Sequence, residues 1–289
     1  MPERARENRP AGGARGNRPQ PQGKRKRPAR GRHALPLFDN WKTISRRIHQ
    51  ANHLLVLLDF DGTLVGFKRR PEEVRLDLSM RRVLALLAKH PRVNLGFISG
   101  RRRADLKGRV RVPGARYWGL HGWEGDGGIP WNPGSRQKLV RARGLLSQAI
   151  HGLPGIWIED KQASLVLHYR EAPISAARRA IAAARKIAAD IQPPLKILAG
   201  KKILELMTPE LEGKGAAVRR LASSRGSGTL AIYAGDDTTD ESAFAALRKG
   251  LTIHVGENRD TQARYRLRDP EEVHAFLDRV SKDFQAPQN

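Results

Sequence analysis

The chain has 289 residues, enough for one large domain or two modest ones, and its 39% of apolar residues is enough to build a packed core. It has no cysteine, which excludes disulfides, thiolate nucleophiles and cysteine-bound zinc, so any metal must be held by oxygen or imidazole. Oxygen ligands suit magnesium best. The formal charge of +25 makes nucleic acids, anionic surfaces and phosphorylated small molecules candidate partners.

The composition also bears on where the protein resides. No run of eighteen apolar residues occurs, and the N-terminus carries arginine and proline instead of an apolar signal core. We therefore expect a soluble, cytoplasmic protein without a membrane partner.

Residues 1–34 form a basic segment in which Arg and Lys alternate with Pro, Gly, Gln and Asn. Such a segment has almost nothing to bury, so we expect a disordered tail. One interpretation is a contact arm for RNA, DNA or another polyanion. The alternative is a solvated extension with only weak, salt-sensitive affinity for polyanions.

From residue 35 onward, strand and helix patterns alternate in the way that builds a parallel sheet. An amphipathic helix over 41–51 leads into the apolar run 53–59, which is typical of a central, buried strand. A helix over 78–89, a strand over 92–98, a helix over 104–110 and a strand over 115–120 follow. The pattern predicts an α/β fold.

The middle of the chain has a different pattern. A loop at 127–134 and a helix over 136–151 precede four strands, over 155–160, 163–169, 195–198 and 202–207, with an alanine-rich helix over 174–190 between the second and third. That order predicts an inserted α+β unit with an antiparallel sheet. After Gly213 the alternation of strands and helices returns, with strands over 229–234 and 251–255 and a last helix over 270–282. We assign 35–121 and 208–289 to the core and 122–207 to the insertion.

Three predicted strands end in acids or hydroxyls, at 59–63, 99–101 and 235–241. In an open parallel sheet, ligands bind beyond the carboxyl ends of the strands. Asp59 and Asp61 are two residues apart, so in an extended chain both side chains point the same way. A carboxylate can attack phosphorus to give an aspartyl-phosphate, and a second carboxyl can protonate the leaving oxygen and then deprotonate water.

The neighbouring residues suit the same chemistry. Gly62 lets the chain turn and bring backbone N–H groups toward a phosphate, and Thr63 adds a hydroxyl donor. Because an anionic nucleophile is repelled by phosphate, cations must lie between them. Asp236, Asp59 and a backbone carbonyl make a sparse oxygen site of the kind that magnesium accepts. Lys214, at a predicted helix start, can reach the phosphate.

Two acids further along the third strand end, Asp237 and Asp240, are candidates for an additional metal ligand or for support of the ligands. On the residues alone, each of these motifs also has a structural interpretation. Acids around Thr238 can simply cap a helix, and an Asp-x-Asp-Gly-Thr segment occurs as an ordinary loop.

The four motifs, at 59–63, Ser99, Lys214 and 235–240, resemble in order those of the haloacid dehalogenase superfamily of aspartate-nucleophile phosphatases. The resemblance covers residues 35–284. It implies a Rossmann-like core with Asp59 as nucleophile, Asp61 as general acid and base, and Ser99 and Lys214 on the phosphoryl group. It also implies Mg²⁺ on Asp59, the Asp61 carbonyl and Asp236, with Asp240 as a further candidate ligand. The insertion matches the placement of a C2-type cap, which usually selects the substrate.

Within the superfamily, five segments resemble the trehalose-6-phosphate phosphatase family: 99–101, 119–124, 158–161, 167–170 and 202–206. The resemblance implies Mg²⁺-dependent hydrolysis of trehalose 6-phosphate to trehalose and phosphate, in trehalose biosynthesis. It places Glu124, Lys161 and Glu205 on sugar hydroxyls, and Arg101 and His168 on the phosphorylated substrate. Charged partners of this kind are what discrimination between polar sugars requires.

Several alternatives remain open at this point. The related substrates are sucrose phosphate, glucosylglycerol phosphate and a mannosyl phosphoglycerate, and other possibilities are a phosphotransferase or mutase, or a binding protein whose tail carries the function. His168 and Tyr169 can pack in an alternating strand, and Lys161 can be a turn residue. Residues 206–214 depart from the family, which more often has Arg before the proline and Asn before the lysine.

Overall fold

The structure, a computed structural model, describes residues 32–66, 73–129, 132–200, 202–257 and 260–285. Its first element, β1 (Arg32–His33), pairs antiparallel with β12 (Asp260–Thr261). The next residue, Ala34, is buried. The prediction of a disordered tail over 1–34 is therefore wrong for residues 32–34, because backbone pairing holds them on the fold. Residues 1–31, and with them the predicted polyanion contact, lie outside the described residues.

A seven-stranded parallel sheet forms the first layer, in the order β2-β13-β11-β10-β3-β4-β5. The strands are β2 (Leu35–Pro36), β3 (His53–Leu58), β4 (Val93–Ile98), β5 (Arg116–Trp118), β10 (Thr229–Gly235), β11 (Leu251–Val255) and β13 (Tyr265–Leu267). Five consecutive apolar residues of β3 are buried, as expected of a strand that is covered on both faces. The predicted α/β fold with a parallel sheet is confirmed.

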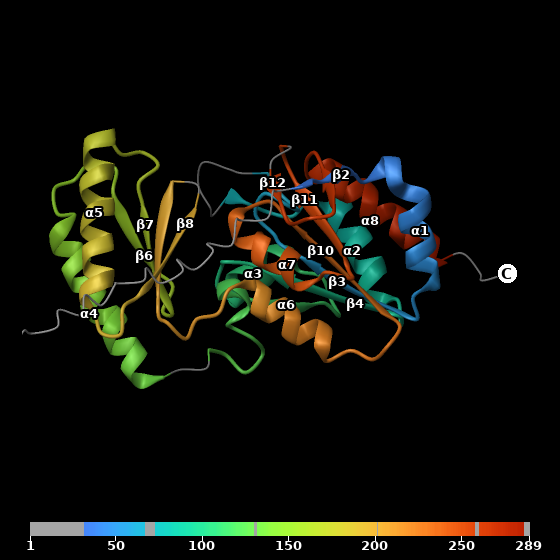
Figure 1. The fold of residues 1–289 in the computed structure, drawn as a ribbon, viewed down its shortest axis with the longest axis horizontal. Helices are drawn as coiled ribbons and strands as arrows, with labels where there is room; N and C mark the ends of the chain where they lie inside the picture. Colours follow the sequence, from blue (N-terminus) through green and yellow to red (C-terminus); the bar gives the residue numbers. More distant parts are fainter. Residues whose placement is uncertain (1–31, 67–72, 130–131, 201, 258–259, 286–289) are drawn as a thin grey trace, which may run out of the picture. The chain divides into compact units, whose positions relative to one another are not determined.

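Helices cover both faces of this sheet (Figure 1). The core on one face includes residues of α1 (Trp41–Gln50), α2 (Leu78–Lys89), α3 (Arg103–Val110) and α8 (Pro270–Gln285), and the core on the other includes α6 (Lys214–Ser223) and α7 (Glu241–Ala246). Alternate residues of β3 point to opposite faces of the sheet, so Val56 lies in the first core and Leu57 in the second. The strand that carries the first motif is therefore fixed from both sides.

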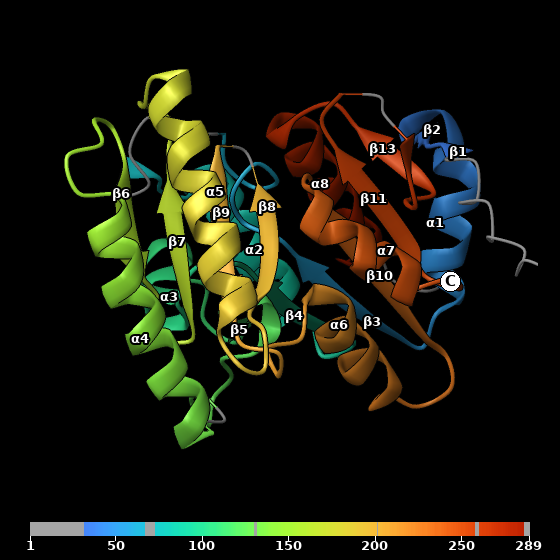
Figure 2. The ribbon, with the colours of Figure 1, turned by 60° about the vertical axis from the view of Figure 1, so that its left-hand side comes forward.

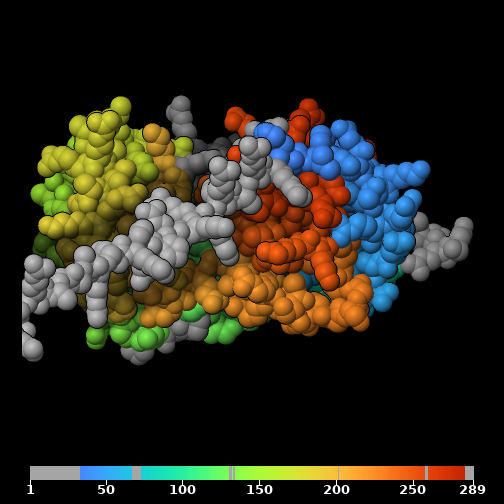
Figure 3. Space-filling view, in the orientation of Figure 1, coloured from blue at the N-terminus to red at the C-terminus, as the bar shows by residue number. Residues whose placement is uncertain are grey.

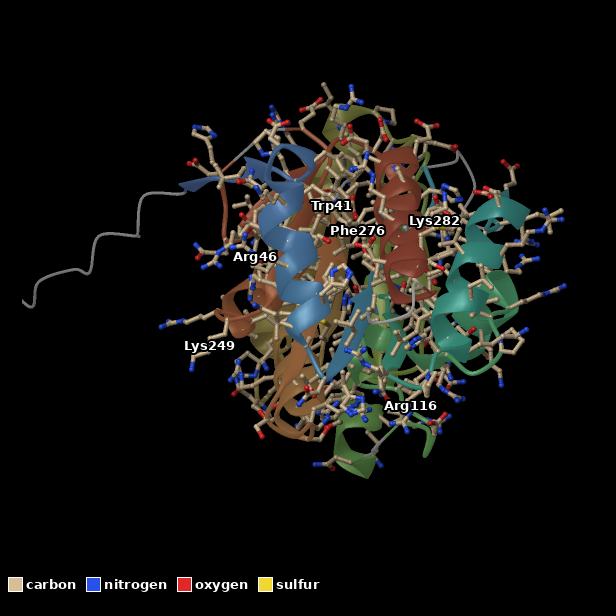
Figure 4. The ribbon with its side chains drawn as sticks, turned by 90° about the vertical axis from the view of Figure 1, so that its right-hand side faces the viewer. Trp41, Arg46, Arg116, Lys249, Phe276 and Lys282 are labelled. Carbon is tan, nitrogen blue, oxygen red and sulfur yellow. The ribbon has the colours of Figure 1, made fainter. Side chains whose placement is uncertain are left out.

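The packing of α1 shows how such a helix is held. It buries Ile44 and Ile48, one turn apart, and Trp41 meets the edge of Phe276 on α8 at 6.2 Å between ring centroids (Figure 4). The sides of α1 and α6 that face away from the parallel sheet lie at the molecular surface (Figure 3). A short 3-10 helix, η1 (Phe38–Asn40), precedes α1. Among the described helices, none has the length and apolarity needed to cross a bilayer.

The insertion between β5 and β10 contains a second, antiparallel sheet in the order β6-β7-β9-β8. Its strands are β6 (Trp157–Asp160), β7 (Ser164–His168), β8 (Lys196–Gly200) and β9 (Ile203–Met207). Alternate residues, among them Leu165, Leu167, Leu204 and Leu206, pack on α4 (Pro133–Ala149) and α5 (Ile174–Asp190) (Figure 2). The other face carries most of the polar residues of these strands, among them Glu159, His168 and Glu205. That the insertion is a separate C2-type cap domain over 122–207 stays a prediction.

Candidate active site

The carboxyl ends of three neighbouring parallel strands meet at one cavity of about 610 Å³. Asp59 follows β3, Ser99 follows β4 and Asp236 follows β10, and these strands are adjacent in the sheet. Lys214, the first residue of α6, joins them in the lining. The three predicted strand ends are thus brought together, as the topology of a parallel sheet requires, and the predicted helix start at Lys214 lies beside them.

A buried ion-pair cluster lies at the floor of the cavity. The Lys214 ammonium, whose side chain is 3% exposed, is 2.9 Å from Asp59 Oδ1 and 2.8 Å from Asp240 Oδ1. Burial raises the pKa of Asp59 well above its usual value; Asp240 and Asp236 raise it further, and Lys214 only partly opposes this. Burial by itself lowers the pKa of Lys214, but the charges of Asp240 and Asp59 raise it above the usual value. Asp59 therefore needs additional positive charge nearby to stay fully ionised.

Three buried carboxylates fit a hard divalent cation. Asp59, Asp236 and Asp240 each offer one oxygen, and these oxygens lie within 4.8 Å of one another. Gly62 lies directly against this cluster with φ +83°, and a Cβ there would be 2.2 Å from Asp236 Oδ2. Only glycine fits that turn. The donor set therefore suits Mg²⁺.

The carboxylate of Asp240 already has several hydrogen-bond partners. Its Oδ1 accepts from Lys214 and from the Tyr233 hydroxyl at 2.6 Å, and its Oδ2 accepts from the Asp237 backbone N–H at 2.9 Å. Asp237 caps the 3-10 helix η4 (Thr238–Asp240). This favours Asp59 and Asp236 as the metal ligands, with Asp240 orienting Lys214. The metal-ligand roles of Asp59, Asp61, Asp236 and Asp240 stay predictions.

The second carboxylate of the first motif is engaged by an arginine. Arg101 Nε and Nη2 donate to the two oxygens of Asp61, both at 2.7 Å, and Nη1 donates to Asp105 at 2.9 Å. Such a bidentate pair fixes both the position and the plane of the carboxylate. Without substrate, Arg101 therefore holds Asp61, and its role in positioning the phosphorylated substrate stays a prediction.

Two hydroxyls complete the predicted phosphate-binding set. Ser99 is buried, and its Oγ accepts from the Arg101 backbone N–H at 3.2 Å. Thr63 is also buried, and within the described ranges its Oγ1 has no hydrogen-bond partner. Thr63 is not among the residues that line the cavity, so its contact with the phosphorylated substrate stays a prediction, which its unpaired buried hydroxyl favours.

Opposite the floor, the polar face of the small sheet closes over the cavity. Glu205 Oε2 lies 3.1 Å from His121 Nε2, and Glu205 Oε1 accepts from Ser164 and lies 3.7 Å from Lys161 Nζ. Lys161 also donates to the Gly100 carbonyl at 3.0 Å. Burial by itself raises the pKa of Glu205, but Lys161 and His121 lower it well below the usual value, so this buried carboxylate is ionised.

Glu124, the remaining predicted sugar contact, and His168, predicted to position the phosphorylated substrate, lie in different places. His168 lines the cavity, 2.9 Å from Glu159 Oε2. Glu124 accepts from Arg102 and from the Arg103 backbone N–H at the start of α3, so it caps that helix and holds Arg102. Arg102, and not Glu124, is among the lining residues. Direct contact of Glu124 with sugar stays a prediction that the ligand-free geometry does not favour.

The structure adds candidate site residues that sequence reasoning missed. His121, Trp157 and Glu159 line the cavity, and Tyr233 holds Asp240 from inside β10. A signal for Tyr233 was present, because it is a hydroxyl-bearing residue in an otherwise apolar buried strand. His121 lies in the 3-10 helix η3 (Leu120–Gly122) with φ 59°, a conformation that the sequence pattern did not indicate.

Comparison with known proteins identifies the family. The sequence profile of the family "trehalose-phosphatase" matches residues 57–271. The chain is 34% identical over 253 residues to a trehalose-phosphate phosphatase of Mycobacterium avium, covering 81% of this chain and 63% of that protein. It is 32% identical over 258 residues to an uncharacterized glycosyl hydrolase of Mycobacterium tuberculosis, covering 83% of this chain and 19% of that protein. The chain thus spans only part of these relatives.

Solved structures show the same fold. The C-terminal domain of a Candida albicans trehalose-6-phosphate phosphatase has a TM-score of 0.74 at 21% identity, covering 88% of this chain and 99% of that one. A trehalose-6-phosphate phosphatase related protein has a TM-score of 0.67 at 28% identity, covering 79% and 97%. A haloacid dehalogenase-like hydrolase from Bacteroides thetaiotaomicron has a TM-score of 0.58 at 16% identity, covering 79% and 99%. Since the matched profile takes in both the cavity floor and the small sheet, the chain belongs to the trehalose-phosphatase family, with a haloacid dehalogenase-like fold.

Proposed function

We propose that the chain hydrolyses trehalose 6-phosphate to trehalose and inorganic phosphate, with Mg²⁺ as cofactor and an aspartyl-phosphate intermediate on Asp59. The observation that carries this proposal is the cluster at the strand ends, where Asp59 is held by a buried lysine beside two further carboxylates. Membership of the trehalose-phosphatase family supports the choice of substrate.

Mg²⁺ held by Asp59 and Asp236 would supply the positive charge that offsets repulsion between a carboxylate and a phosphate. Asp59 attacks phosphorus, and the bond from phosphorus to the sugar oxygen breaks as Asp61 gives that oxygen a proton. Water then attacks the aspartyl-phosphate, Asp61 takes its proton, and the bond between phosphorus and Asp59 breaks. Lys214 neutralises charge throughout, and the Ser99 and Thr63 hydroxyls donate to the phosphoryl oxygens.

Asp61 has to alternate between its protonated and ionised forms. In the ligand-free structure both of its oxygens accept hydrogen bonds from Arg101. The substrate phosphate would compete with Asp61 for Arg101 and so free the carboxyl to face the leaving oxygen. Arg101 thereby connects phosphate binding to the placement of the acid.

The sugar end of the substrate would meet the face of the small sheet. Lys161, His168 and Glu205 line the cavity there, and Glu159 and Arg170 add further charged groups. Polar side chains of this kind discriminate between sugars by leaving a partner unsatisfied when a hydroxyl is absent or misplaced. Without substrate, Lys161 and Glu205 are satisfied by Gly100 and His121, and sugar hydroxyls would replace or extend these contacts.

The test is phosphate release from trehalose 6-phosphate, sucrose phosphate, glucosylglycerol phosphate and a mannosyl phosphoglycerate, with Mg²⁺ and with EDTA. We expect trehalose 6-phosphate to have the highest kcat/KM and EDTA to abolish turnover. Asp59→Asn should abolish turnover while the protein stays folded. The matched control is Asp126→Asn, which changes an acid that is exposed and absent from the cavity lining. A higher kcat/KM for another ester would overturn the substrate assignment, and full activity of Asp59→Asn would overturn the mechanism.

A further inference from the structure

The cavity-facing side of the small sheet is built in cross-strand rows. Strand pairing aligns Trp157, His168, Ile203 and Gly200 in one row across the four strands. The next row, two residues along each strand, contains Glu159, Val166, Glu205 and Leu198. Because side chains alternate between faces, both rows point to the same side, away from the leucines that pack on α4 and α5. The rows are about 7 Å apart along the strands.

Two corners of this sheet donate hydrogen bonds to other parts of the chain, and a third lies near Asp237. At the turn after β6, Lys161 donates to the Gly100 carbonyl at 3.0 Å. At the end of β8, a Cβ on Gly200 would lie 3.9 Å from Asp237 Oδ2. At the start of β8, Lys196 Nζ is 3.5 Å from the Leu211 carbonyl, in the connection to α6. The fourth corner is the start of β6, and its residue is Trp157.

Trp157 combines exposure with a fixed orientation. It lines the cavity, yet it is 48% exposed, which is high for a tryptophan in a folded protein. Its ring is stacked on His168, with centroids 3.7 Å apart and an angle of 3° between the planes. His168 is in turn fixed by Glu159. One face of the indole is therefore covered and held in place, and the exposure belongs to the rest of the ring.

We propose that Trp157 determines specificity by stacking against the sugar ring that does not carry the phosphate. With its phosphate at Asp59, the substrate would extend past the Glu205 row toward the corner of the sheet where Trp157 lies. One face of a pyranose ring presents C–H groups, and covering it with an aromatic face removes apolar surface from water while the hydroxyl edges keep polar partners such as Glu159. This inference rests on the proposed function and names what recognises the second sugar.

The alternative is that Trp157 only covers His168 and stabilises the edge strand β6. The two roles differ in which ligands respond to a change at residue 157. If Trp157 stacks on the second sugar, its replacement weakens binding of trehalose 6-phosphate and of the product trehalose, but not of inorganic phosphate. If Trp157 only packs, its replacement disturbs the whole cavity through His168 and weakens binding of all three ligands.

The experiment uses the full chain and measures kcat and KM for trehalose 6-phosphate, together with the inhibition constants of trehalose and of inorganic phosphate. For Trp157→Ala we expect KM and the trehalose constant to rise about tenfold, with the phosphate constant and kcat within about twofold of wild type. Trp157→Phe should recover most of the loss, and Trp157→Leu, which is apolar but not aromatic, should recover little. Val140→Ala, an exposed residue of α4, is the control that should change nothing.

Each outcome is decisive. Unchanged constants for trehalose and trehalose 6-phosphate in Trp157→Ala and Trp157→Leu would overturn the inference, as would an equal rise in the phosphate constant. If Trp157→Ala does not fold, the comparison of Trp157→Phe with Trp157→Leu still separates an aromatic surface from packing. If wild-type protein hydrolyses trehalose 6-phosphate but the three Trp157 variants all have the same kinetic and inhibition constants, only the proposed role of Trp157 is wrong. Wild-type protein that releases no phosphate from that ester removes the proposed function and this inference together.

Discussion

The buried lysine at the cavity floor allows a quantitative prediction about stability. Lys214→Met keeps the length of the side chain but removes the cation that lies 2.9 Å from Asp59 and 2.8 Å from Asp240. At an effective dielectric constant of 20, each contact is worth about 6 kcal/mol of attraction before the desolvation of the lysine is subtracted. Uptake of protons by the carboxylates limits the loss further. Breaking a buried pair costs about 3–5 kcal/mol, or roughly 10 °C in Tm for a chain of this size.

The assay is urea unfolding followed by circular dichroism at pH 7 in EDTA, so that no metal compensates for the lost charge. Lys214→Met/Asp240→Asn removes one of the carboxylates that the lysine neutralises, and should recover about half of the loss. Lys186→Met, on the exposed side of α5, is the matched control and should change the free energy of unfolding by less than about 0.5 kcal/mol. A loss under about 1 kcal/mol for Lys214→Met would refute the reasoning, because it would mean that the carboxylates are neutral without the lysine.

Three further predictions concern the same cavity. Gly62→Ala should lower kcat by about a hundredfold or more, because its Cβ would displace Asp236; normal kinetics would contradict this. Burial in the folded state raises the pKa of Asp59, so folded protein holds the carboxyl proton more tightly and the free energy of unfolding falls as pH rises above 3.8. Asp59→Asn should therefore be more stable than wild type at pH 7 in EDTA. Thermal melts should show this difference shrinking toward pH 4. The pKa of Glu205 is lowered, so Glu205→Gln should be less stable than wild type at pH 7, and this difference should shrink as pH falls below 4.5; a constant difference would argue against the ion pair with Lys161.

The central strands could be predicted because their sequence and their environment agree. The run that ends at Asp59 is apolar on both faces, and both faces are buried in β3. The helix predicted over 174–190 coincides with α5, whose alanines at every fourth position form its buried side. In contrast, β13 was missed, because Tyr265–Leu267 is short and arginines flank and interrupt it. Its strand character comes from pairing with β11, which no local pattern reveals.

The strand-end residues could be predicted as a group, because a parallel topology gathers them whatever their partners are. Individual side-chain contacts could not. Arg101 and Asp61 are 40 residues apart, and their pairing depends on β3 and β4 being neighbours in the sheet. Glu124 shows the same limit: its segment resembles a sugar-binding one, but the start of α3 lies close enough for Arg102 and Arg103 to take both of its oxygens.

The alternation of residues in β6, β7 and β9 separates two structural roles within single strands. Positions such as Leu165 and Leu167 answer to the packing of α4 and α5, whereas their neighbours face the cavity and answer to the ligand. A substitution at Trp157 or Ile203 can therefore change the surface that a ligand meets without disturbing the leucine layer beneath. If the proposed function holds, exchanging only the cavity-facing rows is a direct route to another sugar preference.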